Sequence, residues 1–267
     1  MPIGVVTGGG GRSPEDLFRS IPPLSKVIIV SMVGMLLSQV MGVFSWHQFA
    51  FIWPLVWKKF QFWRIFTAAF FPGLPGFSTL ITMYTIGMYS IRYEEDSFST
   101  GGGGGSADYS VLLIFGLVVM ETFSVLFLQL PFITSAMLFM IAYVWSRKNA
   151  NSAVSFFGVA VQAVYVPWVM VGINVLMGMG LTEALLGIGV GHLYYFLIDI
   201  LPDTHNIDLI QTPGFLVTLF GWGRADSGVQ RFAPQGGMAA PGVVPPPRAP
   251  GRVGGPSWGP GRTLGVS

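Results

Sequence analysis

The chain has 267 residues and a formal net charge of +2, and 52% of its residues are hydrophobic. Only 10% are charged, whereas soluble domains carry about 25% charge, so the composition is that of a membrane protein without a nucleic-acid partner. The absence of cysteine excludes disulfides and cysteine-based metal or redox sites. The three histidines, His47, His192 and His205, show no ligand spacing, so no metal or cofactor is expected.

The amino-terminal segment, residues 1–23, predicts a short interfacial helix ahead of the membrane domain. Ser13 is a good N-cap, Pro14 suits the first helical position, and the two acids that follow favour the positive end of the helix dipole. Pro22-Pro23 ends this helix. A plain juxtamembrane linker is the alternative. The next apolar run ends in no small-residue cleavage pattern, so we expect an uncleaved first span rather than a signal peptide.

Six apolar runs between residues 24 and 201 predict six transmembrane helices. A helix needs about 20 residues to cross a hydrocarbon core of about 30 Å, and the second and fourth runs are shorter than this. Either the second extends back through Thr67–Phe71 across a Pro-Gly break, or both spans are short and thin the bilayer. The runs are Leu24–Phe44, Phe77–Ile91, Tyr109–Leu130, Phe132–Trp145, Gln162–Met179 and Glu183–Leu201.

The loop between the first two runs, residues 45–75, is rich in Trp and Phe, with three basic residues among them. This composition suits an element embedded in the lipid headgroup region, because an aqueous loop with so many exposed aromatics would aggregate. By contrast, the acidic residues and glycine run of Arg92–Asp108 predict a flexible solvated linker. Ser152–Val161 is read as a short re-entrant or interfacial stretch.

Beyond the last run, Pro202 is expected to end the sixth span, and residues 202–223 form a connector. Residues 224–267 are rich in Gly, Pro and Arg and predict a disordered tail. An even number of spans places both termini on one side of the membrane. That side holds Arg92 and Arg147-Lys148, so the positive-inside rule puts both termini in the cytosol.

Glu121, Asn174 and His192 are polar side chains inside the expected spans, and Gln162, Glu183 and Asp199 add polar groups in or beside the last two. A carboxyl at the depth of Glu121 needs a partner, a proton or a water-filled cavity, and Asn174 and His192 are its candidate neighbours. A hydrated groove or conduit would require such groups. Ordinary hydrogen bonds between helices would also account for them.

The sequence contains no motif of a known hydrolase. It lacks a Gly-x-Ser-x-Gly elbow, a His-Glu-x-x-His pair and a phosphate-binding Gly-rich loop. An intramembrane dyad of Ser135 with His192 is conceivable, but no glycines flank Ser135 to open space around a nucleophile. Serines at membrane depth usually bond to their own helix, so we expect no enzyme.

Several short blocks, in the same order along the chain, resemble the Derlin family, the rhomboid pseudoproteases of the endoplasmic reticulum. The family's Trp-Arg pair in the first lumenal loop falls on Trp63 and Arg64, and its Gly-x-x-x-Gly in the sixth span falls on Gly187 and Gly191. The matching blocks are Asp16–Pro22, Phe60–Arg64, Ala107–Tyr109, Tyr165–Val169, Gly191–Leu197 and Thr212–Leu216.

The resemblance implies an all-α membrane protein of the endoplasmic reticulum, a rhomboid-like bundle of six transmembrane helices whose first lumenal loop is half-embedded in the bilayer. It also implies that the protein helps to retrotranslocate misfolded proteins to the cytosol, together with a membrane ubiquitin ligase complex and, in one arrangement, as a homo-oligomer. In this fold Gly187 and Gly191 would let the sixth span approach the fourth closely. Arg64 would brace the first loop by hydrogen bonds.

The end of the tail resembles the SHP box with which some Derlins bind a cytosolic AAA ATPase. Its residues are Trp258, Gly259, Gly261, Arg262, Leu264 and Gly265. An aromatic ring and a leucine can fill apolar pockets, while Pro260 departs from the pattern because it removes a backbone donor. The leading hypothesis is a conduit or membrane-thinning factor that recruits this ATPase. Two alternatives remain: a scaffold that links ligase and ATPase without a passage of its own, and an active intramembrane serine protease.

Overall fold

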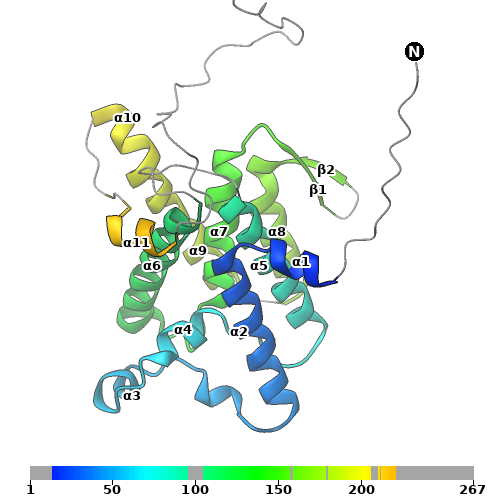
Figure 1. Cartoon of the computed structure of the whole chain (residues 1–267), viewed down its shortest axis with the longest axis vertical. Coiled ribbons are helices and arrows are strands. Elements are labelled where there is room, and N and C mark those ends of the chain that lie inside the picture. Colours follow the sequence, from blue (N-terminus) through cyan, green and yellow to red (C-terminus); the bar gives the residue numbers. More distant parts are fainter. Residues whose placement is uncertain are drawn as a thin grey trace, which may run out of the picture. The chain divides into compact units, whose positions relative to one another are not determined.

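The computed structural model describes residues 14–95, 105–156, 159–178, 180–205, 210 and 212–220, and the tail motif lies outside them. One helix stands in each expected span (Figure 1). These helices are α2 (Pro23–Val40), α5 (Phe77–Glu95), α6 (Gly105–Phe123), α7 (Thr134–Lys148), α8 (Val166–Leu176) and α9 (Leu181–Tyr195). Apolar runs become helices in lipid because the backbone must satisfy its hydrogen bonds internally.

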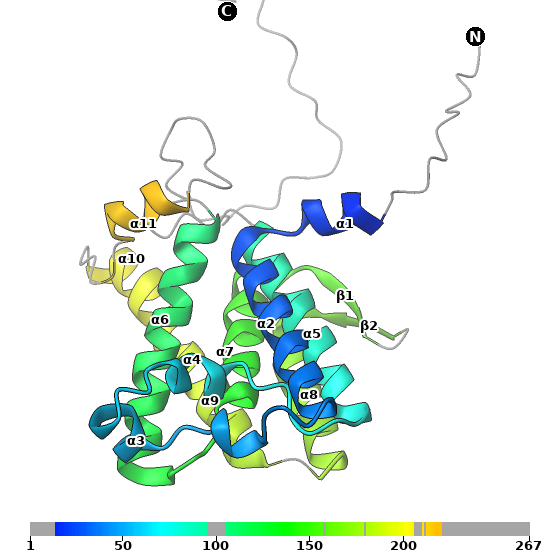
Figure 2. The same cartoon turned by 60° about the horizontal axis from the view of Figure 1, so that its bottom comes forward.

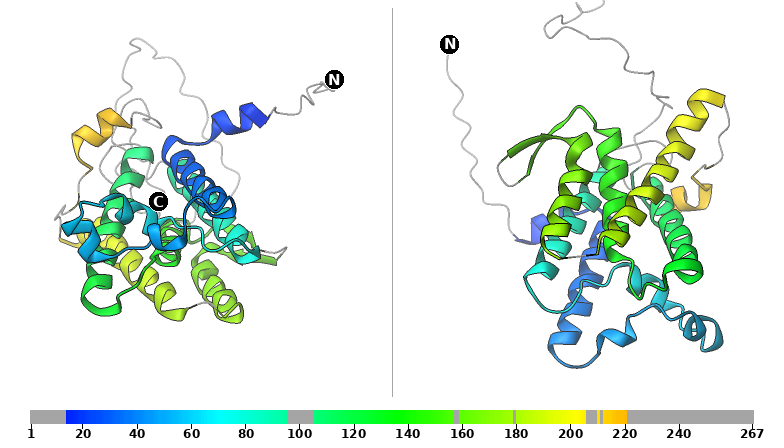
Figure 3. Two further views of the ribbon diagram at one scale, coloured as in Figure 1. Left: turned by 90° about the horizontal axis from the view of Figure 1, so that it is seen from below. Right: turned by 180° about the vertical axis from the view of Figure 1, so that it is seen from behind.

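Helix α7 forms the centre of the bundle. Its residues from Ala136 to Ser146 are all buried, as expected for a helix that is apolar on every side. Helices α5, α6, α8 and α9 all pack against it. Seen from behind, α8, α7 and α9 lie side by side (Figure 3). The remaining long helix, α2, packs on α5 and α6.

The two ends of the bundle carry different short elements (Figure 2). One end, which we call the loop end, holds the first loop with α3 (Trp53–Lys58) and α4 (Trp63–Ala69). The opposite end, which we call the tail end, holds α1 (Pro14–Ser20) and α11 (Gly214–Leu219). The expected amino-terminal helix and its stop at Pro22-Pro23 are therefore confirmed.

Three helical segments in the described part of the chain are long and apolar enough to cross a membrane. They are Pro23–Val40, Gly105–Leu128 and Leu181–Ile200, and the last two include short π-helical turns at Ser124–Leu128 and Phe196–Ile200. Ala163–Leu176 is a shorter apolar helix. The mostly helical membrane bundle is thus confirmed, while the count of six spans remains a prediction.

The expected solvated linker over Arg92–Asp108 is wrong at both of its ends. Helix α5 continues to Glu95, with Tyr93 and Glu94 buried, and α6 already begins at Gly105. Only residues 96–104 lie outside the described part. The helix at the second expected span therefore has 19 residues, so it is neither short nor extended back through the first loop.

The region around the fifth span also differs from the prediction. Residues of Ser152–Val161 form an antiparallel hairpin, β1 (Ala153–Phe156) with β2 (Val159–Gln162), in which Ala153 pairs with Gln162. A 3-10 turn follows, so α8 has only 11 residues and starts later than Gln162. The hairpin joins α7 to α8 at the tail end (Figure 2).

The sixth span does not stop at Pro202. After the π-helical turn, α10 (Leu201–His205) continues the helix through this proline. Proline inside a helix lacks the N–H that would bond to the carbonyl four residues earlier, and in this chain the helix widens into a π-helical turn directly ahead of Pro202. The connector therefore begins as helix.

Candidate functional site

Helices α9 and α7 meet through the glycine pair. A Cβ built on Gly187 would collide with the carbonyl oxygen of Ala136, and one on Gly191 would lie 3.2 Å from the carbonyl oxygen of Met140 and from the Tyr143 ring. A side chain is excluded at Gly187, and at Gly191 it would need Met140 and Tyr143 to shift slightly, because the two backbones run so close together. The expected contact of the sixth span with the fourth is confirmed.

His192 belongs to a chain of polar groups that α7 and α9 share. Its Nδ1 lies 2.8 Å from the Tyr143 hydroxyl, which also accepts a hydrogen bond of 3.0 Å from Arg147 Nε. The Tyr143 hydroxyl can accept from Arg147 and still donate its own proton to Nδ1 when the histidine carries its proton on Nε2. His192 is exposed on α9 rather than enclosed.

Ser135 does not meet His192. Its hydroxyl is hydrogen-bonded to Glu183, the neighbour at the start of α9. Eight residues along α7 separate Ser135 from the partner of His192, Tyr143, which is about 12 Å at 1.5 Å per residue. The conceivable serine–histidine dyad is therefore not formed.

Glu121 and Asn174 do not bond to each other. Glu121 is 7% exposed, and neither of its carboxyl oxygens has a hydrogen-bond partner among the described residues. Asn174 donates to the carbonyl oxygen of Gly180 at 3.2 Å. Asn174 and His192, the candidate neighbours of Glu121, therefore do not hydrogen-bond to it, and both make other hydrogen bonds.

Arg64 holds the first loop together from inside. Its Nε donates to Gln61 Oε1 at 2.6 Å, and its Nη1 donates to the carbonyl oxygens of His47 and Ala50 at 2.9 and 2.7 Å. The side chain is buried, whereas its neighbour Trp63 is 56% exposed. The bracing role expected of Arg64 is confirmed, and Trp63 faces outward.

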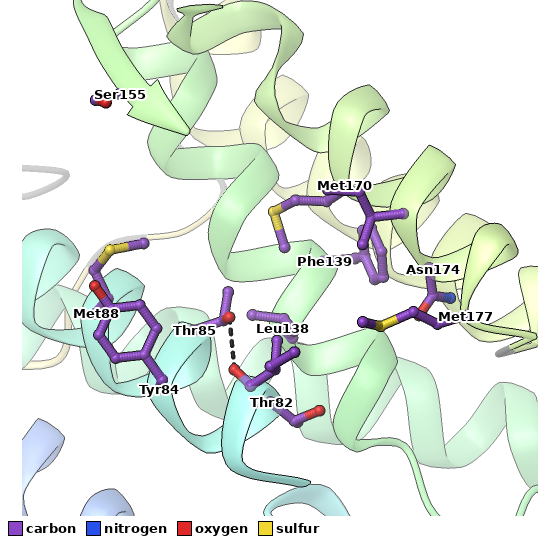
Figure 4. A pocket seen from close by; sticks show the side chains of 12 residues that line it. Thr82, Tyr84, Thr85, Met88, Leu138, Phe139, Ser155, Met170, Asn174 and Met177 are labelled. Atoms are coloured by element: carbon purple, nitrogen blue, oxygen red, sulfur yellow. Dashed lines mark hydrogen bonds between the residues drawn. The ribbon is translucent and has the colours of Figure 1, made fainter. Parts of the chain in front are cut away.

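A groove of about 330 Å³ opens between α5 and α8, with α7 as its floor (Figure 4). Its walls are largely apolar, and a few polar groups, including Thr82 and Asn174, interrupt them. Such a lining suits an apolar ligand segment that contains occasional polar groups. The sequence did not predict the groove, since three helices far apart along the chain contribute to it.

A second hollow, of about 520 Å³, lies beside the groove at the loop end. We call it the Ser135 pocket. Thr79, Thr134, Ser135 and Glu183 make it more polar than the groove, and Trp46 and Phe71 from the first loop close one side. Thr82 lines both hollows. The polar pocket and the apolar groove are therefore neighbours.

Two buried carboxylates at the tail end were missed by the sequence prediction. Glu94 is 1% exposed and accepts hydrogen bonds from the backbone of α2 and from Ser106. Asp108, also 1% exposed, accepts a hydrogen bond from Thr212. One sequence signal could have pointed to the bond between Asp108 and Thr212, because both residues lie in blocks that match the family.

The described helices, with their apolar outer faces, define a multi-pass helical membrane protein. The model of the Der1-like family matches residues 21–214, so the chain belongs to this family. It is 36% identical to the probable derlin-2 homolog of Dictyostelium discoideum, over 77% of this chain and 82% of that protein. It is 34% identical to Derlin-1 of Oryza sativa subsp. japonica, over 83% and 90%, and 33% identical to human Derlin-1, over 83% and 92%.

Family membership supports a role associated with endoplasmic-reticulum degradation and a place in the membrane of that compartment. Derlins are rhomboid-like pseudoproteases, which are generally non-catalytic. The resemblance stated from the short sequence blocks is thereby confirmed over most of the chain.

Proposed function

We propose that the protein is a non-enzymatic component of endoplasmic-reticulum-associated degradation that passes misfolded proteins towards the cytosol. The observation that carries this proposal is that the polar Ser135 pocket adjoins the apolar groove, since Thr82 lines both. A misfolded segment has polar and apolar parts. The polar part can bind in the Ser135 pocket while the apolar part lies in the groove against α5 and α8.

The position of the groove favours lateral access. Helices α5 and α8 both pack on α7, and α8 turns exposed apolar residues outward, among them Trp168, Val175 and Leu176. An apolar segment in the bilayer can therefore reach the groove from the side of α8. No covalent chemistry is needed, because van der Waals packing and hydrogen bonds between helices are what hold segments together within lipid.

The short α8 supports local thinning of the bilayer. Together with the 3-10 turn before it, this helix covers Ala163–Leu176, which is about 22 Å and still below a core of about 30 Å. Helix α7 is short as well, with 15 residues, but its burial keeps it from lipid. Thinning is thus proposed beside α8 and the groove rather than at the second span.

The tail is proposed to recruit a cytosolic AAA ATPase through its SHP-like residues Trp258 to Gly265, with both termini in the cytosol. A membrane ubiquitin ligase complex would act on the emerging substrate. Deletion of residues 256–267 should abolish ATPase pull-down and leave substrate binding in the groove intact. Loss of substrate binding in this deletion would contradict the division of labour.

The groove itself is tested by photo-crosslinking. A photoreactive residue at Ile173, which lines the groove, should capture a misfolded membrane substrate. The matched control is Val30, an apolar residue of α2 that is 51% exposed. Equal capture at both positions would show only general contact in the bilayer.

A filling substitution separates a conduit from a scaffold. Thr85→Trp places a large ring in the groove and should slow substrate degradation, whereas Val30→Trp should not. If Thr85→Trp leaves degradation unchanged while the tail deletion abolishes it, the protein is a scaffold without a passage of its own.

A further inference from the structure

The tail end carries a short segment that is docked rather than loose. Residues 212–220 follow the last membrane helix, and α11 within them packs against α6. Leu216 is the apolar anchor, at 6% exposure. The polar anchor is Thr212, whose hydroxyl donates to Asp108 Oδ1. We call this segment the latch.

The polar anchor has an unusual acceptor. Asp108 is 1% exposed at the start of α6, so its carboxylate has been removed from bulk water. A buried carboxylate depends strongly on the donors that reach it. Lys148 interacts electrostatically with Asp108, but it also faces Asp199, so two carboxylates already share its positive charge.

Thr212 is also not fully enclosed, and it precedes a proline. Its side chain is half-buried, and Pro213 follows with an extended backbone at φ −61° and ψ 136°. A Cβ on Gly214 would meet nothing within 4 Å. A threonine followed directly by an extended proline is the substrate form that proline-directed protein kinases accept.

We propose that Thr212 is a phosphorylation site and that its phosphorylation releases the latch from α6. In the transfer, the bond between the γ-phosphorus of ATP and its bridging oxygen breaks, and a bond to Thr212 Oγ1 forms. ADP leaves, and the hydroxyl proton passes to the base of the kinase. The proposal rests on the proposed cytosolic position of the tail end.

Release follows from the charges that phosphorylation changes. The modified residue has lost the proton that it donated to Asp108, and it carries about −1.5 to −2 charge at pH 7. Placed against a buried carboxylate, this charge is repelled. Because Asp108 and Asp199 already share the positive charge of Lys148, a phosphate would add a third negative group beside this single cation.

The consequence concerns the root of the tail. While docked, the latch fixes the tail to the α6 end of the bundle. Once released, residues 212–220 become additional tether, and nine flexible residues have an end-to-end distance of their own of roughly 15 Å. Phosphorylation would therefore regulate the distance over which the tail can deliver its proposed ATPase partner.

The test uses the full chain in lipid nanodiscs. Because the protein contains no cysteine, Leu216→Cys introduces a single thiol at the buried anchor. A recombinant proline-directed kinase and ATP should add one phosphate, mapped to Thr212 by mass spectrometry. Maleimide labelling of the thiol should then accelerate on the order of tenfold, which corresponds to about 1.4 kcal/mol.

Matched variants separate charge from the loss of a donor. In the Leu216→Cys background, Thr212→Val removes the hydrogen bond only and should accelerate labelling less than phosphorylation does. Thr212→Ser should retain both docking and phosphorylation. Asp108→Asn removes the repelling charge, so phosphorylation should then accelerate labelling less than it does with Asp108 present.

A second measurement avoids the engineered thiol. In the unmodified sequence, hydrogen exchange at the Phe220 amide, which donates to the Leu216 carbonyl oxygen at 2.8 Å, should quicken after phosphorylation. No phosphate at Thr212 in the folded chain overturns the proposal, provided that the same kinase modifies a peptide of residues 206–218. Phosphate at Thr212 with unchanged labelling and exchange also overturns it. Neither result depends on substrate crosslinking, so the groove is judged separately.

Discussion

The carboxylate of Glu94, at the end of α5, caps the start of α2. Its Oε2 accepts hydrogen bonds from the backbone N–H and the hydroxyl of Ser25, at 2.8 and 2.7 Å, and its Oε1 accepts from the N–H of Leu24 at 3.0 Å and from Ser106 at 2.6 Å. The first N–H groups of a helix have no partner within it. One side chain thus joins three helices at the tail end.

Glu94→Gln should destabilise the protein, because an amide offers one acceptor oxygen where four donors converge. We expect a loss of about 2–3 kcal/mol from donors left unpaired, seen as a melting temperature lower by roughly 5–10 °C. Thermal unfolding in detergent measures it. Glu95→Gln, at the exposed neighbour, is the control. Equal melting temperatures for the two variants would contradict this role of Glu94.

The glycines of α9 should tolerate valine in a fixed order. Gly187→Val forces a side chain against the Ala136 backbone and should be the most damaging, and Gly191→Val should be intermediate, since Met140 and Tyr143 need only shift slightly. Overpacking of this kind costs about 1–3 kcal/mol. Gly189→Val, with nothing within 4 Å, is the matched control.

Expression level, thermal unfolding and degradation of a misfolded substrate should follow that order. If Gly189→Val were as damaging as Gly187→Val, the effect would belong to helix propensity or lipid contact. The close packing of α7 on α9 would then not be what the glycine pair provides.

The features that sequence predicted well depend on local patterns. Gly187 and Gly191 could be assigned a contact because a spacing of four places them on one helix face. The features that it missed depend on distant partners. Glu94 looked like part of a solvated acidic linker, and only its bonds to Ser25, 69 residues away, explain its burial. The hairpin was missed because a short apolar run fits a strand and a helix equally.

Lys148 should titrate near pH 8, well below an ordinary lysine. It lies past the expected fourth span, and burial lowers its pKa to about 8 against the smaller opposing effects of Asp199 and Asp108. Below that pH the amine is protonated and unreactive. Acetylation by acetic anhydride, followed by mass spectrometry at a series of pH values, should show half-maximal reactivity at Lys148 near pH 8. A midpoint near 10.4, the value of an exposed lysine, would contradict it.

The lowered pKa of Lys148 also makes the stability of the protein depend on pH. Because the pKa of Lys148 is lower in the folded protein than in the unfolded chain, the unfolded chain binds more protons between about pH 8 and 10.4. The contribution of this group to the free energy of unfolding therefore rises with pH across that window. Lys148→Met should remove the rise, which unfolding measurements at pH 7.5 and 9.5 can compare.

Arg64→Lys should weaken the first loop although it keeps the charge. A lysine ammonium lacks the planar fork with which Arg64 reaches Gln61 and the carbonyl oxygens of His47 and Ala50. Loss of these bonds should cost about 1.5–3 kcal/mol and raise the rate of proteolysis within residues 45–75. Gln61→Ala is the matched variant, since it removes the Nε partner alone and should cost less.

Binding of the ATPase by the tail should be unchanged in both variants, because the loop and α11 stand at opposite ends of the bundle. Unaltered proteolysis in Arg64→Lys would show that the loop is held by its apolar contacts instead.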